Sequence, residues 1–155
     1  MTTFIDASSR IGPRTVIWHF AVILANVVIG ADCSIGSGTE IGRGSTIGDL
    51  TRISAHVFLP SNSRIGQQVF IGPGVICTDD RYPCARERGE PPYVAQPPTI
   101  EDGAIIGAGS VILPGVVIGH HAFVGAGAIV TQNVPSGILV RGEAARPHLL
   151  RVGSR

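Results

Sequence analysis

The chain has 155 residues, of which 44% are hydrophobic and 15% are charged, so it can form one folded domain with a substantial core and is not disordered. Its net charge of +1 gives no support for a nucleic-acid or acidic-membrane partner. No apolar stretch reaches the roughly 18 residues of a membrane span, and the N-terminus lacks a signal-peptide pattern, so we expect a cytoplasmic protein.

Three cysteines agree with a reducing compartment. Cys33, Cys77 and Cys84 form an odd number and lack the spacing of a metal site. Cys33 occupies a small-residue position of the repeat described next, which predicts a buried free thiol.

A period of six residues runs through most of the chain. From Ile5 to Ile71 every sixth residue is Ile or Leu, and the period resumes from Ile100 to Val130. Glycine directly follows the aliphatic residue in ten units, and a small or β-branched residue stands four positions after it. This pattern predicts a short strand followed by a corner, with the aliphatic side chain inside and glycine giving backbone freedom.

Three such units close one triangular coil, so residues eighteen positions apart are expected to stack. Twelve units precede the break in the period and six follow it, which predicts about six coils in a single domain over residues 1–155.

Residues 77–99 break the period. This segment contains five of the eleven prolines and both tyrosines, and we interpret it as an inserted loop that covers a functional site. Residues 136–155 also leave the repeat. We expect this tail to cap the open end of the coil stack with a final strand and a short helical turn.

The pattern aliphatic-Gly-x-x-small-x resembles that of the hexapeptide-repeat acyltransferases, whose fold is an all-β, left-handed parallel β-helix. Two segments resemble one branch of that family, the N-acetyltransferases of nucleotide-linked 3-amino sugars: Ile-Trp-His-Phe at 17–20 and Thr-Asp-Asp-Arg-Tyr-Pro at 78–83. The later glycine-rich block is common to many hexapeptide acyltransferases.

The resemblance implies acetyl-CoA as cosubstrate, a UDP- or dTDP-linked amino sugar as acceptor, no metal, and a homotrimer with active sites between subunits. The sequence agrees with such an assembly. One flat side of the coil, which carries Val22, Leu24 and Val28, is expected to have more outward-facing apolar residues than a monomer needs.

The loop supplies the predicted acceptor site. In the resembled branch an Asn at the position of Asp79 holds the sugar amine, whereas this chain has a carboxylate that could act as a clamp or as a base. The resemblance also places Asp80, Arg81 and Tyr82 at the substrate. His56 stacks beneath Gly74, so we predict that it is the histidine nearest the site, with a catalytic or a structural role.

The glycine-rich block supplies the predicted cofactor site. Ile-Gly-Ala-Gly-Ser at 106–110 and Val-Gly-Ala-Gly-Ala at 124–128 are eighteen residues apart, so their small corners are expected to stack beside a pantetheine arm, as in the family. Two arginines of the tail could meet the CoA phosphates, although Glu143 brings a like charge to that pocket. The predicted contacts are Ala108, Gly109, Ser110, Ala126, Arg141 and Arg146.

The sequence leaves three other functions as alternatives. An O-acetyltransferase that uses His56 as general base on a sugar or antibiotic hydroxyl is the main alternative. A γ-carbonic-anhydrase-like metal hydratase needs three histidines on facing corners, but His19 and His56 are one residue out of the stacking register, and His120 and His121 are consecutive. A non-catalytic scaffold would not need the long loop.

Overall fold

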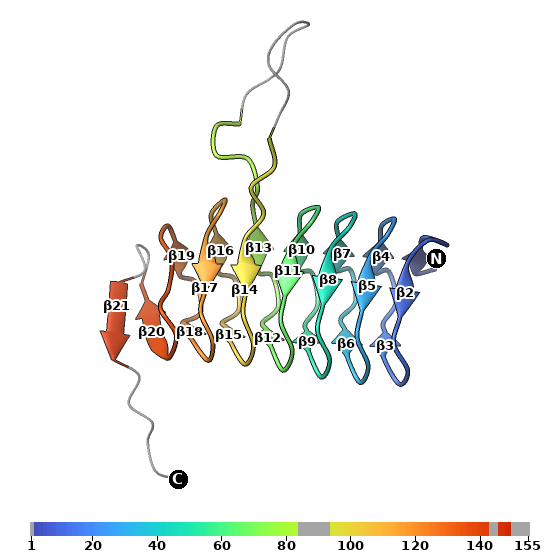
Figure 1. The fold of residues 1–155 in the computed structure, drawn as a ribbon, viewed down its shortest axis with the longest axis horizontal. Coiled ribbons are helices and arrows are strands. Elements are labelled where there is room, and N and C mark those ends of the chain that lie inside the picture. The colour runs from blue at the N-terminus through green and yellow to red at the C-terminus, as the bar shows by residue number, and fades with distance from the viewer. Residues whose placement is uncertain (1, 84–93, 143–145, 150–155) are drawn as a thin grey trace, which may run out of the picture.

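The computed structural model describes residues 2–83 and 94–142, together with the backbone of residues 146–149. Within these ranges the chain is all β and contains no helix, and hence no helix that is long and apolar enough to cross a membrane. The strands form a left-handed parallel β-helix of about seven turns, which confirms the predicted fold class (Figure 1).

Three parallel sheets form the walls of the solenoid, and the chain passes from sheet A to sheet B to sheet C in each turn. Sheet A contains β1 (Phe4–Ile5), β4 (Val22–Ile23), β7 (Glu40–Ile41), β10 (Phe58–Leu59), β13 (Ile76–Cys77), β16 (Val111–Ile112) and β19 (Ile129–Val130). Sheet B contains β2 (Arg10–Ile11), β5 (Val28–Ile29), β8 (Thr46–Ile47), β11 (Arg64–Ile65), β14 (Thr99–Ile100) and β17 (Val117–Ile118). Sheet C contains β3 (Val16–Ile17), β6 (Ser34–Ile35), β9 (Arg52–Ile53), β12 (Phe70–Ile71), β15 (Ile105–Ile106), β18 (Phe123–Val124), β20 (Ile138–Arg141) and β21 (Arg146–Leu149).

The corners between the sheets form three edges that run along the solenoid. The AB edge contains residues 6–9, 24–27, 42–45, 60–63, the loop 78–98, 113–116 and 131–133. The BC edge contains residues 12–15, 30–33, 48–51, 66–69, 101–104, 119–122 and 135–137. The CA edge contains residues 18–21, 36–39, 54–57, 72–75, 107–110 and 125–128.

The second residue of each two-residue strand points inward, and these residues stack into the core. Ile5 is paired with Ile23, which is eighteen residues later, and Ile65 is paired with Ile100 across the loop. Because the second separation is thirty-five residues, the loop adds seventeen to the eighteen of a regular turn. Most inward aliphatic side chains are fully buried, and each such burial contributes about 1.5–3 kcal/mol of hydrophobic stabilisation.

The small position of the repeat also lies inside, where its hydroxyl groups join adjacent turns. Thr39 Oγ1 donates to the carbonyl of Ser54 at 2.8 Å and accepts a hydrogen bond from the amide of Val57 at 3.3 Å. Thr51 makes the same pair of bonds with Gly66 and Val69. In the part of the chain that the structure describes, no buried side-chain nitrogen or oxygen lacks a hydrogen-bond partner, so the polar residues of this core are satisfied.

The glycine that follows the aliphatic residue is required for a reason other than the expected backbone freedom. Positive φ angles fall two residues further on, for example at Arg14, Asp32 and Gln68. At the repeated glycines the backbone of the next turn comes too close for a side chain: a Cβ on Gly36 would lie 2.4 Å from the amide nitrogen of Ala55, and one on Gly107 would lie 2.3 Å from that of Ala126. Close approach of adjacent turns therefore requires glycine here.

The inserted loop is one residue shorter at each end than residues 77–99. Cys77 ends β13 and takes the inward position of the repeat, where it is fully buried, while Thr99 begins β14 and pairs with Arg64. Counting Cys77 as a thirteenth unit, together with the strand of the tail, explains why there are about seven turns and not six.

The tail caps the last turn with strands only. β20 extends sheet C in parallel with β18, and β21 turns back antiparallel to β20. The expected helical turn is absent from the described part of the tail. This hairpin covers an otherwise open sheet edge, as a cap should.

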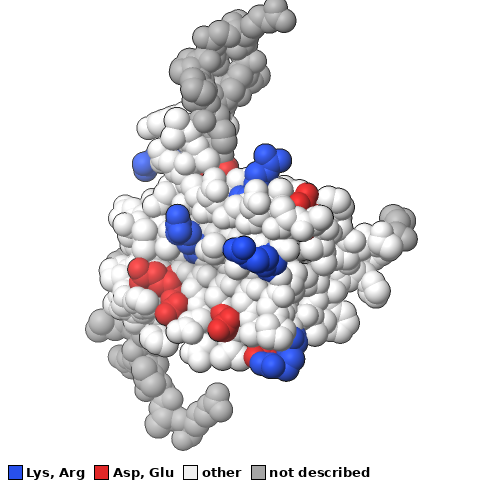
Figure 2. Space-filling view, turned by 45° about the vertical axis from the view of Figure 1, so that its right-hand side comes forward, with Lys and Arg blue, Asp and Glu red and all other residues white. Residues whose placement is uncertain are grey.

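The outward positions differ between the sheets. Large hydrophobic side chains are exposed on sheet A at Phe4, Phe58, Ile76 and Ile129, and on sheet C at Val16, Phe70 and Ile105. Val22, Leu24 and Val28 do not share one flat side, because they lie on sheet A, the AB edge and sheet B, and all three are half-buried. Arginine and acidic side chains are interspersed on the face shown in Figure 2.

The Cys77 thiol is expected to be unreactive in the folded protein. Burial raises its pKa from 9.0 to about 12, so the reactive thiolate is scarce at pH 8. Because the unfolded thiol ionises at lower pH than the folded one, stability should fall as the pH rises from about 9 towards 12. Peptide-resolved iodoacetamide labelling tests the first expectation, and urea unfolding of wild type and Cys77→Val at several pH values tests the second. Rapid labelling of Cys77 in the native protein would contradict the expected low reactivity. An equal pH dependence of stability in wild type and Cys77→Val would contradict the expected loss of stability at high pH.

Candidate functional site

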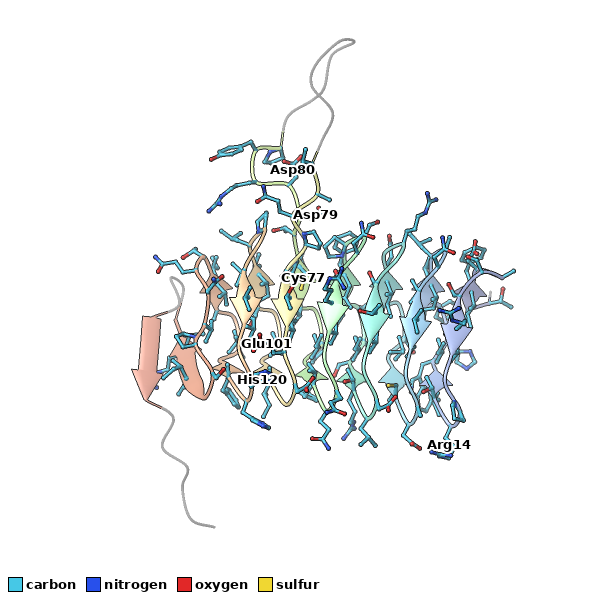
Figure 3. All side chains as sticks on the ribbon, in the orientation of Figure 1. Arg14, Cys77, Asp79, Asp80, Glu101 and His120 are labelled. Atoms are coloured by element: carbon cyan, nitrogen blue, oxygen red, sulfur yellow. The ribbon has the colours of Figure 1, made fainter. Side chains whose placement is uncertain are left out.

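The loop leaves the solenoid at the AB edge, and hydrogen bonds fix its base. The amide of Thr78 donates to the carbonyl of Ile112 at 3.0 Å, and the amide of Gln96 donates to the carbonyl of Asp79 at 2.8 Å. The carbonyl of Gln96 in turn accepts a hydrogen bond from the amide of Gly115 at 2.7 Å. A backbone hydrogen bond therefore ties Asp79 on the outgoing segment of the loop to Gln96 on the returning segment, and Figure 3 shows Asp79 and Asp80 above Cys77.

A cavity of about 310 Å³ lies beside this base. It is lined by Thr78, Asp80, Arg81, Pro83, Leu113, Pro114 and Thr131. Of the four predicted loop residues, the structure places Asp80 and Arg81 in the lining. Asp79 is half-buried next to them, while Tyr82 is 82% exposed and its amide donates to Asp80 Oδ1 at 3.0 Å.

Five lining residues were not predicted from the sequence: Thr78 and Pro83 at the ends of the loop motif, and Leu113, Pro114 and Thr131 of the solenoid. Thr78, Leu113 and Thr131 each directly follow a strand of sheet A, namely β13, β16 and β19. Since Leu113 and Thr131 are eighteen residues apart, the repeat places them in one column above the start of the loop. This eighteen-residue spacing is the feature of the sequence from which they could have been predicted.

The predicted cofactor residues gather on the CA edge, away from the loop. Gly74, Gly109 and Gly127 occupy the same corner position in successive turns, and a Cβ on any of them would meet no atom within 4 Å. Elsewhere this corner position carries residues such as Asn26, Leu50 and Gln68 at positive φ, so the backbone angle alone does not demand glycine. We call the row of Gly74, Gly109 and Gly127 the glycine strip.

Arg141 lies next to the C-terminal end of the glycine strip. It ends β20, is exposed, and its Cβ lies 3.0 Å from where a Cβ on Gly125 would be. Ala108 and Ala126 are also exposed on this edge. Arg146 pairs with Arg141 in the β20–β21 hairpin, although the side chain of Arg146 lies outside the described atoms.

Ser110 differs from the other predicted cofactor residues because its side chain points into the core. Its single hydroxyl proton is shared between the carbonyls of Gly107 at 2.8 Å and Gly125 at 3.0 Å, and the Ser110 carbonyl accepts from the amide of Ile76. The Ser110 hydroxyl therefore links adjacent turns, and only its backbone borders the strip.

His56 and Asp79 lie on different edges of the chain. His56 is exposed on the CA edge one turn below Gly74, whose amide donates to the carbonyl of Ala55 at 3.0 Å. Asp79 follows the opposite end of β13, on the AB edge. Contrary to the expectation that His56 lies close to the loop, one chain does not bring the two predicted catalytic side chains together.

Three other histidines, His19, His120 and His121, lie close to neighbouring residues in the described part of the chain. The His19 ring lies 6.2 Å from that of Phe20, and a Cβ on Gly103 would meet the ring of His121 at 2.2 Å. On the BC edge, His120 Nε2 lies 3.4 Å from Glu101 Oε2, and the His120 amide also donates to that oxygen (Figure 3). Among the described residues, no three His, Cys, Asp or Glu side chains gather where they could hold a metal.

Comparison with known sequences identifies the repeat. The family model of bacterial transferase hexapeptides (six repeats) matches residues 8–43 and 97–132. An acetyltransferase of Schizosaccharomyces pombe is 38% identical over 84 residues, which are 54% of this chain and 41% of that protein. A 2,3,4,5-tetrahydropyridine-2,6-dicarboxylate N-acetyltransferase of Staphylococcus aureus is 56% identical over 57 residues, or 37% of this chain and 23% of that protein. Each match spans less than half of the curated relative.

Comparison with solved structures leads to the same family. A hexapeptide-repeat acetyltransferase from Vibrio cholerae, solved in complex with acetyl-CoA, superposes with a TM-score of 0.66 at 29% identity. The superposition covers 79% of this chain and 69% of that one. The six-residue repeats of this chain match those of the bacterial transferase hexapeptide model, and the solenoid that they build is similar to that of hexapeptide-repeat acetyltransferases.

Proposed function

We propose that the protein is an acetyl-CoA-dependent N-acetyltransferase that acetylates the amino group of a UDP- or dTDP-linked 3-amino sugar. The observation that carries this proposal is the fixed loop base, which holds the Asp79 backbone beside a cavity containing the Asp80 carboxylate and the Arg81 guanidinium. A carboxylate can bind a sugar amine or hydroxyl, and a guanidinium can bind a phosphate.

The glycine strip supports acetyl-CoA as the donor. Open backbone along three turns leaves room for a pantetheine arm, and the Arg141 guanidinium at the end of the strip suits a CoA phosphate. The Vibrio cholerae acetyltransferase, which is 29% identical to this chain over the superposed residues, was solved with acetyl-CoA bound. We infer that the backbone at Ala108, Gly109 and Ala126 borders the bound arm, with Arg141 and Arg146 at the phosphates.

The chemistry requires positioning more than strong acid–base catalysis. The amine attacks the thioester carbonyl, a tetrahedral intermediate forms, and the C–S bond breaks with thiolate as the leaving group. The amine loses one proton, and the CoA thiolate gains one. Asp79 would orient the amine, and it could also accept the proton that the amine releases.

The glycine strip and the cavity lie on different edges, which supports a site made from two subunits. In one chain, sheet A separates the CA edge from the AB edge, so a donor on the strip would be remote from an acceptor in the cavity of the same chain. A homotrimer in which the strip of one subunit faces the loop base of the next would join the two halves. The exposed apolar residues of sheets A and C supply surface for such contacts.

One observation favours a second candidate, an O-acetyltransferase. His56 lies on the same edge as the glycine strip, directly below Gly74, and its exposed imidazole could serve as general base for a sugar or antibiotic hydroxyl near the thioester.

A thiol-release assay with acetyl-CoA and a panel of UDP- and dTDP-linked amino and hydroxy sugars tests both candidates. With a 3-amino sugar, we expect Asp79→Ala to lower kcat/KM by about tenfold to a hundredfold, as for loss of a hydrogen bond to a charged group. Asp79→Asn should retain most activity, because the amide oxygen still accepts from the amine. His56→Ala should retain activity as well. Turnover of a hydroxyl acceptor that is lost in His56→Ala would overturn the N-acetyltransferase proposal.

A further inference from the structure

The cavity beside the loop base has one rigid wall. Thr78, Leu113 and Thr131 follow three neighbouring strands of sheet A, and strands in a sheet lie about 4.8 Å apart. The amide of Thr78 donates to the carbonyl of Ile112, and that of Leu113 donates to the carbonyl of Val130, each at 3.0 Å. Because this wall belongs to the solenoid, the sheet holds its side chains at a fixed spacing.

The lining combines apolar and polar residues. Leu113 and Pro114 from the solenoid and Pro83 from the loop are apolar, and Pro114 is buried. The polar lining residues are Asp80, Arg81, Thr78 and Thr131, and the Thr78 hydroxyl donates to the carbonyl of Ile112 at 3.1 Å. A pyranose ring has the same division, with C–H groups on its faces and hydroxyl or amino groups around its rim. The volume of about 310 Å³ is at the lower end of the range for ligand sites, which suits one sugar ring better than a whole nucleotide.

We propose that this cavity holds the hexose of the acceptor and that Leu113 and Thr131 determine which hexose is accepted. Leu113 and Pro114 pack against one face of the ring, and the Thr131 hydroxyl bonds to one of its substituents. The inference rests on the proposed function, and it adds two specificity residues that belong to the solenoid and not to the loop. A rigid wall suits this task because discrimination between sugars depends on the fixed position of one hydroxyl or methyl group.

Two substitutions test the two interactions separately. Thr131→Val removes the hydroxyl but keeps the shape of the side chain, and we expect kcat/KM for the preferred sugar to fall about tenfold, as for the loss of one hydrogen bond. The deoxy analogue that lacks the bonded hydroxyl should be turned over equally by wild type and Thr131→Val. Leu113→Ala should raise the KM for the nucleotide sugar about tenfold by removing apolar contact with the ring. Thr46→Val is the matched control, because Thr46 is exposed on sheet B away from the loop.

The donor and the nucleotide are measured in the same variants. The KM for acetyl-CoA and the Kd for free UDP or dTDP should match those of wild type. A raised KM for acetyl-CoA with an unchanged KM for the sugar would overturn the proposal and assign the cavity to the donor. A weakened Kd for free UDP or dTDP would overturn it in favour of the nucleotide.

A binding experiment separates this inference from the proposed function. Saturation-transfer NMR with methyl glycosides of hexoses and 3-amino hexoses measures sugar binding without any reaction. If no nucleotide sugar is acetylated but methyl glycosides bind to wild type and more weakly to Leu113→Ala, the proposed function fails and the sugar cavity stands. If a nucleotide sugar is acetylated and neither variant changes acceptor kinetics relative to Thr46→Val, the cavity assignment fails and the proposed function stands. If no nucleotide sugar is acetylated and no methyl glycoside binds, both the proposed function and the cavity assignment are overturned.

Discussion

Gly109→Asn should strongly weaken acetyl-CoA binding while leaving the protein folded. Gly109 has φ of 66° and open space beside it, so an asparagine side chain would meet no protein atom at its Cβ and would fill the middle of the glycine strip. Asparagine already occupies the same kind of corner at Asn26 and Asn62, so the backbone strain is small. Isothermal titration calorimetry with acetyl-CoA should show Kd raised at least about tenfold, a loss of about 1.4 kcal/mol or more.

Gly137→Asn is the matched control for this substitution. Gly137 also has a positive φ, of 71°, and a Cβ added to it would meet no atom within 4 Å, but it lies on the BC edge. The Gly137→Asn protein should bind acetyl-CoA like wild type and melt at the same temperature as Gly109→Asn. Unchanged acetyl-CoA affinity in Gly109→Asn would show that the donor does not lie on the strip.

The same variant tests whether each site is shared between subunits. Asp79→Ala has an impaired loop base and an intact glycine strip. Gly109→Asn has an intact loop base and an impaired glycine strip. Each variant alone should therefore be largely inactive. If a trimer joins the loop base of one subunit to the strip of the next, refolding an equal mixture should restore about one quarter of wild-type activity. Three quarters of random trimers contain both chains, and one of their three sites is intact. No recovery in trimers shown to be mixed would place both halves of the site in one chain.

Ile71→Ala should destabilise the protein by about 2–5 kcal/mol. The Ile71 side chain has a relative exposure of 0%, and it stacks between Ile53 and Ile106 in sheet C. Removing three carbons leaves a cavity that the turns above and below cannot fill without breaking their own hydrogen bonds. Urea unfolding followed by circular dichroism measures the loss as a lower midpoint.

Two controls accompany this measurement. Ile71→Val removes one methyl group and should cost about 0.5–1.5 kcal/mol, and the exposed Thr46→Val should cost less than about 0.5 kcal/mol. If Ile71→Ala costs no more than Ile71→Val, the Ile71 side chain is not packed between neighbouring turns.

The sequence alone determined the solenoid and the position of its interruption. An aliphatic residue at every sixth position can be buried only by stacked three-sided coils, so Ile23, Ile41 and Leu59 could be assigned to the core from their spacing. Cys77 was missed as a core residue because a thiol does not look like an aliphatic in a sequence pattern, although it packs as one.

Only the tertiary structure decided how the candidate site residues are distributed. Sequence spacing put Asp79 near His56, but sheet A separates their corners. His56 precedes β10 on the CA edge, whereas Asp79 follows β13 on the AB edge. It also did not distinguish Gly107, which the next turn crowds, from Gly109, which borders open space. A repeat specifies which residues stack, because burial acts on every turn alike. The loop and the tail do not follow the six-residue repeat. Their packing against the solenoid decides which corners remain open, and this packing exists only in the folded chain.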